Sequence, residues 1–180
     1  MTTWIALFRA INVGGRNVIS MKDLTADLEQ LRLSGIRTYI QSGNVAFESS
    51  RRSADSLRSA IRKHILGQRG FEPELIVLRR DELQQAVTEN PFPEAAREPS
   101  TLHYFFLDQP AGDADLEAMK LSAAPSERHS LTPRVFYLHA PEGVGRSKLA
   151  RNAERHLGVP TTARNHRTVT KLLQLTAPDD

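Results

Sequence analysis

Cysteine is absent from this chain of 180 residues. The absence excludes disulfide bonds, thiolate metal ligands and a cysteine nucleophile. It is also consistent with a reducing compartment, and we predict a cytoplasmic protein.

Long apolar runs are missing too. No stretch approaches the roughly 20 apolar residues that a membrane-spanning helix needs. The apolar run at Trp4–Phe8 is too short for the core of a signal peptide, and no basic leader precedes it. We therefore expect no membrane partner.

A large excess of one charge is lacking as well. The chain has 24 Lys and Arg against 21 Asp and Glu, a net charge of +3. Basic pairs such as Arg51–Arg52 and Arg79–Arg80 are spread out, whereas nucleic-acid-binding proteins usually concentrate their cations on one face. The six histidines show no metal-ligand spacing, and no carboxylate pair suggests acid–base chemistry. The sequence thus indicates no metal, no cofactor and no identifiable catalytic residue.

The first half of the chain reads as strand, helix, two strands, helix and strand. Ser20 is an N-cap for a helix whose apolar residues recur at helical spacing and which Gly35 is expected to end. Residues 41–44 form a short hairpin signal between two apolar segments. The expected segments are a strand at 4–8, the helix from 21, strands at 36–40 and 45–47, a helix at 54–65 ending near Gly67–Gly70, and a strand at 73–78.

The second half repeats much of this order. Asp81 is expected to cap a short helix that ends before Asn90–Pro91. Residues 90–100 carry three prolines and read as a linker. There follow a strand at 101–107, a helix from Asp113, a hairpin at 128–131 and 134–139, a helix at 147–157 ending at Gly158, an extended piece at 161–162, and a last helix with Val169, Leu172 and Leu173.

These patterns predict an α+β fold of two related ferredoxin-like (split β-α-β) subdomains. The predicted boundaries are residues 1–89, a linker at 90–100, and residues 101–180. The strands at 4–8 and 101–107 are apolar on both faces, so neither face of either sheet can be left to water. We expect each half to cover the other in one compact unit.

Polar loops are expected to meet at one edge of the first sheet. In a β-α-β-β-α-β unit, the loop after the first strand and the hairpin between the middle strands lie at the same edge. The segments 9–17 and 41–44 should therefore be neighbours. The candidate ligand-binding residues there are Arg9, Asn12, Gly14, Gly15, Arg16, Asn17, Gln41, Ser42 and Asn44.

A second polar edge is expected in the second half, where residues 141–148 and 161–165 should meet. Each segment contains an arginine beside a helix start, and free N–H groups at a helix start favour anions. The arginine adds a planar charged fork that suits a carboxylate or a phosphate. The candidate residues are Ser147, Lys148, Arg164, Asn165 and Thr168.

Purely structural roles account for many of the same residues. Gly14–Gly15 fits a tight turn, and residues 42–44 fit an ordinary hairpin turn. Ser147 reads as a helix cap, while Arg164 and Asn165 could brace the last helix. Neither G-x-G-x-x-G nor the spacing of a phosphate-binding loop is present, which disfavours a dinucleotide fold and a nucleotide hydrolase.

Five segments in order carry a family resemblance: RAINVGGRNVISMKDL (9–24), RTYIQSGNVAFES (37–49), NPF (90–92), YLHAPEGVGRSKL (137–149) and TTARNHRTVTKL (161–172). Together they resemble the bacterial family known as domain of unknown function 1697, over nearly the whole chain. The resemblance implies an α+β fold of two related subdomains and no established reaction, substrate or cofactor. The motif positions are Arg9, Asn12, Gly14, Gly15, Tyr39, Ser42, Gly43, Asn44, Ser147, Arg164, Asn165 and Thr168.

The chain departs from this family at one place. The last motif commonly reads arginine-asparagine-tryptophan-asparagine-threonine, whereas this chain has His166 and Arg167 at the middle two positions. If the tryptophan stacks on a ligand, that contact is altered here. If it only packs, a histidine replaces it modestly.

The function that these observations favour is binding of a small anionic or nucleotide-like ligand through the polar loops. Nucleic-acid binding is the alternative, although the aromatic and basic signature of RNA-recognition domains is missing from residues 44–49. An enzyme that uses Arg164 as an anion clamp, and a purely structural or interaction protein, are further alternatives. The oligomeric state does not follow from the sequence.

Overall fold

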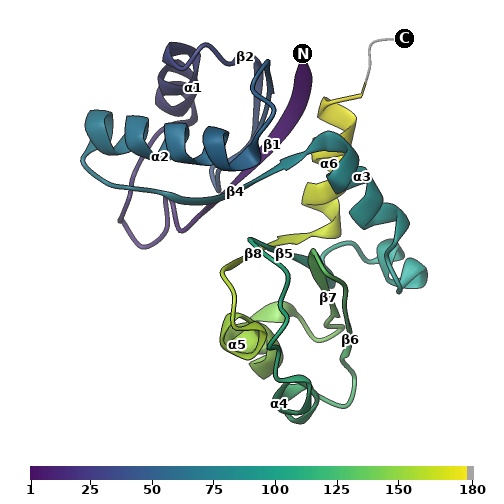
Figure 1. Cartoon of the computed structure of the whole chain (residues 1–180). Helices are drawn as coiled ribbons and strands as arrows, with labels where there is room; N and C mark the ends of the chain where they lie inside the picture. Colours follow the sequence, from purple (N-terminus) through teal and green to yellow (C-terminus); the bar gives the residue numbers. More distant parts are fainter. Residues whose placement is uncertain (178–180) are drawn as a thin grey trace. The chain divides into compact units, whose positions relative to one another are not determined.

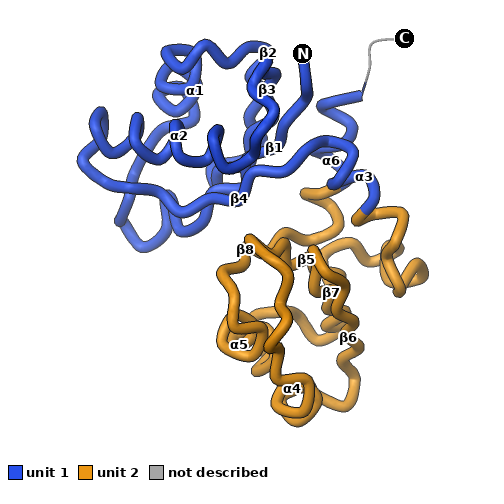
Figure 2. The backbone as a smooth tube through the Cα atoms, in the orientation of Figure 1, with its two compact units in different colours: residues 1–85, 170–180 blue, residues 86–169 orange. Residues whose placement is uncertain are grey.

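Two four-stranded antiparallel sheets form the framework of the chain in this computed structural model, which describes residues 1–177 (Figure 1). The chain divides into two compact units. Unit 1 holds Met1–Gln85 and Thr170–Asp180, and unit 2 holds Ala86–Val169 (Figure 2).

Unit 1 has the strand order β2-β3-β1-β4, with every neighbouring pair antiparallel. This is the split β-α-β arrangement that the sequence predicts. Its elements are β1 (Thr2–Arg9), α1 (Met21–Gln30), β2 (Ser34–Tyr39), β3 (Asn44–Ser49), α2 (Ala54–Arg69), β4 (Glu74–Arg79) and α3 (Arg80–Thr88).

Unit 2 repeats the arrangement with the strand order β6-β7-β5-β8. Its elements are η1 (Pro93–Arg97), β5 (Leu102–Leu107), α4 (Leu116–Ser122), β6 (Arg128–Leu131), β7 (Val135–His139), η2 (Val144–Arg146), α5 (Lys148–Leu157), β8 (Thr161–Asn165) and the first part of α6 (His166–Leu175). The predicted fold class, α+β with two related subdomains, is confirmed.

Helix starts follow the local cap signals. Ser20 caps α1 as predicted, because its hydroxyl accepts a hydrogen bond from the Asp23 amide at 3.0 Å. Two other predicted starts were wrong. Asp115 rather than Asp113 caps α4, and α3 begins at Arg80, so Asp81 lies within its first turn. Several acidic residues near a helix start are all compatible with the cap pattern, and tertiary packing selects among them.

The end of α1 also differs from the prediction. The helix ends at Gln30, and the amides of Leu31 and Arg32 close its last turn on the carbonyls of Leu28 and Glu29. Gly35, expected to end the helix, instead lies in β2 with φ +57°, where the pairing with β3 shifts register. Its freedom at positive φ therefore serves a strand irregularity rather than a helix end.

Each sheet packs one face against its own helices. In unit 1, the side chains of Trp4, Ala6 and Phe8 on β1 join a core with the buried faces of α1 and α2. The alternate residues Ile5 and Leu7 are also fully buried, so β1 is apolar on both faces as its sequence indicates. That the two halves cover each other stays a prediction.

The compact units divide the chain at different points from the predicted subdomains. The second part of α6 belongs to unit 1, and the segment at 90–100 contains the short helix η1 with Phe92 and Ala95 buried. Burial of these two side chains anchors a segment that the prolines alone suggested to be a linker. Within residues 1–177, no helix has the length and apolar composition needed to cross a membrane.

Gly43 offers a test of close packing at the start of β3. It has φ +74°, and a Cβ built there would lie 2.6 Å from Phe8 Cβ and 2.5 Å from Ile11 Cδ1. Gly70 has the same φ, but a Cβ there would meet nothing within 4 Å. We expect Gly43→Ala to lower the free energy of unfolding by about 1–3 kcal/mol more than Gly70→Ala, measured by urea denaturation. Equal losses would show that backbone strain alone matters at both positions.

Candidate functional site

The first sheet edge brings together the loop after β1 and the hairpin before β3. Leu7 lies opposite Asn44, and the Phe8 amide donates to the Gly43 carbonyl at 2.8 Å. The two segments that topology predicted to be neighbours are therefore in contact.

The Asn12 side chain links the two segments of this edge by hydrogen bonds. Its amide nitrogen donates to the carbonyls of Ile19 and Gln41, each at 2.9 Å, and its amide oxygen accepts from the Ile19 amide at 2.8 Å. Asn44 is fully buried and donates to the Tyr39 carbonyl at 3.1 Å. Both amides hold the protein's own backbone together.

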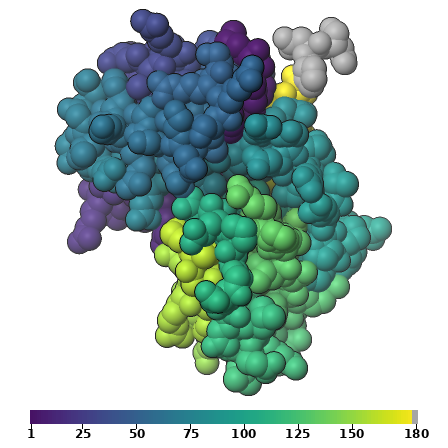
Figure 3. Space-filling model, viewed as in Figure 1, coloured from purple at the N-terminus to yellow at the C-terminus, as the bar shows by residue number. Residues whose placement is uncertain are grey.

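The glycine pair forms a tight turn at the tip of the loop. Gly14 and Gly15 have φ of +59° and +71°, and Val13 pairs with Arg16 across them in a short antiparallel bridge. Positive φ at both central residues is the geometry of a two-residue hairpin turn. Residues 13–18 are exposed, and Figure 3 shows purple side chains standing out at the lower left of unit 1. Arg16 and Asn17 thus face solvent, whereas Arg9 lies 3.4 Å from Glu74 in an ion pair.

The second sheet edge lies where β7 and β8 end. His139 pairs with Leu102, and Asn165 pairs with His103, so both strand ends lie beside the start of β5. Ser147 is an N-cap, since its hydroxyl accepts from the Ala150 amide at 2.9 Å.

Two more predicted residues of this edge take part in the protein's own contacts. Asn165 accepts from the Thr168 amide at 3.0 Å and so braces the start of α6. Thr168 is buried, while Lys148 is exposed.

Arg164 is largely removed from water. It donates to the Thr162 hydroxyl at 3.0 Å and to the Ala163 carbonyl at 2.8 Å. Burial lowers the pKa of Arg164 to about 10, because the charged form loses hydration. The side chain still carries its charge at neutral pH, and it lies on β8 directly opposite Tyr104 of β5.

His166, at the position where the family motif has tryptophan, packs against Tyr104. The two rings are stacked with centroids 5.8 Å apart, and the Tyr104 hydroxyl lies 2.8 Å from His166 Nδ1. Burial raises the pKa of Tyr104 well above its usual range and lowers the pKa of His166. The ring at this position therefore makes a packing and hydrogen-bonding contact inside unit 2.

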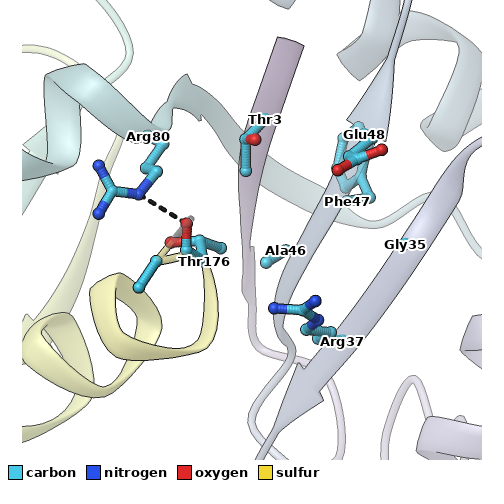
Figure 4. Close-up of a pocket in the computed structure, with 9 residues that line it drawn as sticks. Thr3, Gly35, Arg37, Ala46, Phe47, Glu48, Arg80 and Thr176 are labelled. Atoms are coloured by element: carbon cyan, nitrogen blue, oxygen red, sulfur yellow. Dashed lines mark hydrogen bonds between the residues drawn. The ribbon is translucent and has the colours of Figure 1, made fainter. Parts of the chain in front are cut away.

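A cavity in unit 1 was missed by sequence reasoning. It has a volume of about 240 Å³ and lies between the last turn of α6 and the face of β1, β2 and β3 that is turned away from α1 and α2 (Figure 4). The residues that line it are Thr3, Gly35, Arg37, Ala46, Phe47, Glu48, Arg80, Thr176 and Ala177. They come from segments far apart in the sequence and form no local motif, so no sequence signal could have assembled them.

Two arginines border this cavity and bind the end of α6. Arg37 Nη1 donates to the Leu175 carbonyl, and Arg80 Nε donates to the Thr176 carbonyl at 2.8 Å. Cations suit a helix C-terminus, where carbonyl groups lack helical partners. Among residues 1–177, no carboxylate lies within ion-pair distance of either guanidinium. Each keeps further N–H donors beyond the one spent on the helix.

Glu48 supplies a negative charge at the other end of the cavity. It is exposed and stands two residues along β3 from Ala46, which is the partner of Arg37 in the sheet. Residues two apart on a strand point to the same face. Figure 4 shows Arg37 and Glu48 on opposite sides of Ala46.

The hydrogen bonds of Asn12 give a first test of its structural role. We expect Asn12→Ala to lower the free energy of unfolding by about 2 kcal/mol, because three backbone groups lose their partner and the two on Ile19 are part-buried. Gln41→Ala is the matched control, since it retains the carbonyl that Asn12 binds, and we expect a change of less than about 0.5 kcal/mol. Urea denaturation measures both. A neutral Asn12→Ala would contradict the structural role.

A second test concerns pH. Burial lowers the pKa of His103 from its ordinary 6.5, although a backbone contact with Thr101 offsets part of the shift. Below its ordinary pKa, the unfolded state therefore binds more protons than the folded state, and stability falls as the pH drops. We expect the free energy of unfolding of His103→Leu to fall less than that of the native chain between about pH 7 and about pH 5. Equal slopes in pH-dependent urea denaturation would contradict this assignment.

Comparisons with known proteins bear on the fold and the family. A conserved bacterial protein from Streptococcus pneumoniae, SP0830, has a similar structure with a TM-score of 0.72, 23% identity, and coverage of 97% of this chain and 98% of that one. This likeness shows the fold. No curated protein matches the chain. The family model for protein of unknown function DUF1697 matches residues 1–137, although the last two resembling segments fall almost wholly beyond that match. The chain therefore belongs to the family described as protein of unknown function (DUF1697).

Proposed function

We propose that the protein binds a small ligand through an anionic group, in the cavity bordered by Arg37. The observation that carries the proposal is a guanidinium that lines a cavity of about 240 Å³ and has no carboxylate partner among the described residues. A guanidinium presents a planar fork of donors that matches a carboxylate or a phosphate. An anion there would accept hydrogen bonds from the Arg37 N–H groups that do not bond to the Leu175 carbonyl of α6.

The size of the cavity narrows the ligand. Drug-sized and cofactor ligands usually occupy pockets of about 300–1,000 Å³. The cavity here is smaller, which favours a metabolite with few heavy atoms over a dinucleotide. Thr3 of β1 also lines the cavity and adds a hydroxyl group for hydrogen bonding, whereas the Thr176 hydroxyl donates to the Leu172 carbonyl at 2.8 Å.

The two sheet edges take a lesser part in the proposal. The amides of Asn12, Asn44 and Asn165 are used inside the protein, which leaves exposed side chains such as Arg16 and Lys148 as the remaining predicted contacts. Nucleic-acid binding and an enzymatic role for Arg164 stay alternatives that no specific observation favours.

Calorimetry with inorganic phosphate and valerate, at low salt, tests the proposal. We expect binding by the native chain and a loss of affinity of about tenfold or more in Arg37→Gln, because a charge-assisted contact is removed. Arg155→Gln is the control, since Arg155 is exposed in the last turn of α5, and it should bind as the native chain does. Thermal unfolding without ligand reports separately on the bond from Arg37 to α6. The proposal would be refuted if the native chain bound neither phosphate nor valerate, or if Arg37→Gln bound them as tightly as the native chain does.

A further inference from the structure

The cavity carries charges of both signs: Arg37 and Arg80 supply cations, and Glu48 supplies an anion. Arg37 lies opposite Ala46, and Glu48 is two residues further along β3 on the same face. Ala46 and Glu48 are about 7 Å apart along β3, and Arg37 starts from the neighbouring strand β2. A ligand lying along β3 would meet a cation at one end and an anion at the other.

Glu48 has its acceptor atoms at the disposal of a ligand. No described residue forms an ion pair or a hydrogen bond with its carboxylate, and the side chain is exposed. Gly35 follows Ser34, the sheet partner of Glu48, and a Cβ at Gly35 would lie 3.4 Å from Glu48 Cγ. The missing side chain at Gly35 therefore keeps space open beside Glu48.

A cross-strand ion pair between Arg37 and Glu48 is the simplest competing explanation. Diagonal neighbours on adjacent strands are within reach of long side chains. In the structure, however, Arg37 turns to the Leu175 carbonyl, and its guanidinium is not within ion-pair distance of Glu48. The helix end thus holds the two charges apart.

We infer that the ligand is a small zwitterion whose anionic group binds Arg37 and whose ammonium group binds Glu48. This inference rests on the proposed function and names its ligand class. The two long side chains start from diagonal positions on neighbouring strands. A molecule that meets both suits several carbons between its ammonium and its anionic group better than the single carbon of an α-amino acid. Each charged end then replaces its water with a charge-assisted hydrogen bond.

The test compares δ-aminovalerate with valerate, which differ in the amino group alone, and includes glycine as a short zwitterion. By calorimetry, we expect the native chain to bind δ-aminovalerate about tenfold more tightly than valerate and to bind glycine no better than valerate. Glu48→Gln should bring the ratio of the two affinities to about one. Glu29→Gln, an exposed change on α1, is the control and should keep the native ratio.

The outcomes separate the two proposals. Equal affinity of the native chain for δ-aminovalerate and valerate would overturn the zwitterion and leave anion binding intact. If the native chain bound none of these compounds and no phosphate, both the anion-binding proposal and the zwitterion inference would be overturned. If Glu48→Gln lowers stability at low salt and keeps the native affinity ratio, Glu48 serves the sheet and the inference is refuted.

Discussion

The carbonyl groups at the end of α6 impose the constraint on which the candidate site depends. A helix leaves its last four carbonyls without helical partners, and here Arg37 from β2 and the Arg80 side chain of α3 supply donors. The Arg37 bond joins the end of α6 to the first sheet, and the Arg80 bond joins it to α3. The helix starts in unit 2, where Asn165 braces it, and ends as part of unit 1. The cavity lies where that turn meets the face of β1, β2 and β3 that is turned away from α1 and α2.

Polar side chains in this chain are of two kinds: some bond to the protein's own backbone, and others keep hydrogen-bonding groups that a ligand can use. Asn12, Ser147 and Asn165 satisfy backbone groups that a loop or a helix start would otherwise leave unpaired. Such bonds make the sheet edges well-defined scaffolds. Arg37 and Glu48 differ, because each keeps hydrogen-bonding capacity that no described residue uses. A polar side chain is a candidate ligand contact when it keeps unused hydrogen-bonding groups, and its polarity alone is not enough.

The same distinction explains how far the candidate site could be anticipated. The meeting of residues 9–17 with 41–44 follows from strand order alone, and the structure has the contact between Asn12 and Gln41. Whether a side-chain amide there bonds to a ligand or to a backbone carbonyl depends on its position to within about an ångström. The sequence pattern does not specify that position. Arg37 and Arg80 lay outside the predicted sites, because their shared environment is made by residues as far as 138 positions away. Long-range contacts of this kind leave no periodicity in the sequence.

By itself, the sequence determined the elements and their order. Apolar spacing marks the helices, Ser20 and Ser147 mark helix starts, and the two halves share one strand order because each carries the same succession of elements. These signals act within a few residues and survive in any context. The tertiary structure alone decided that α4 starts after Asp115, that Gly35 lies in a strand, and that α6 ends against the first sheet. In each case several local solutions are nearly equal in free energy, and packing between distant segments selects one.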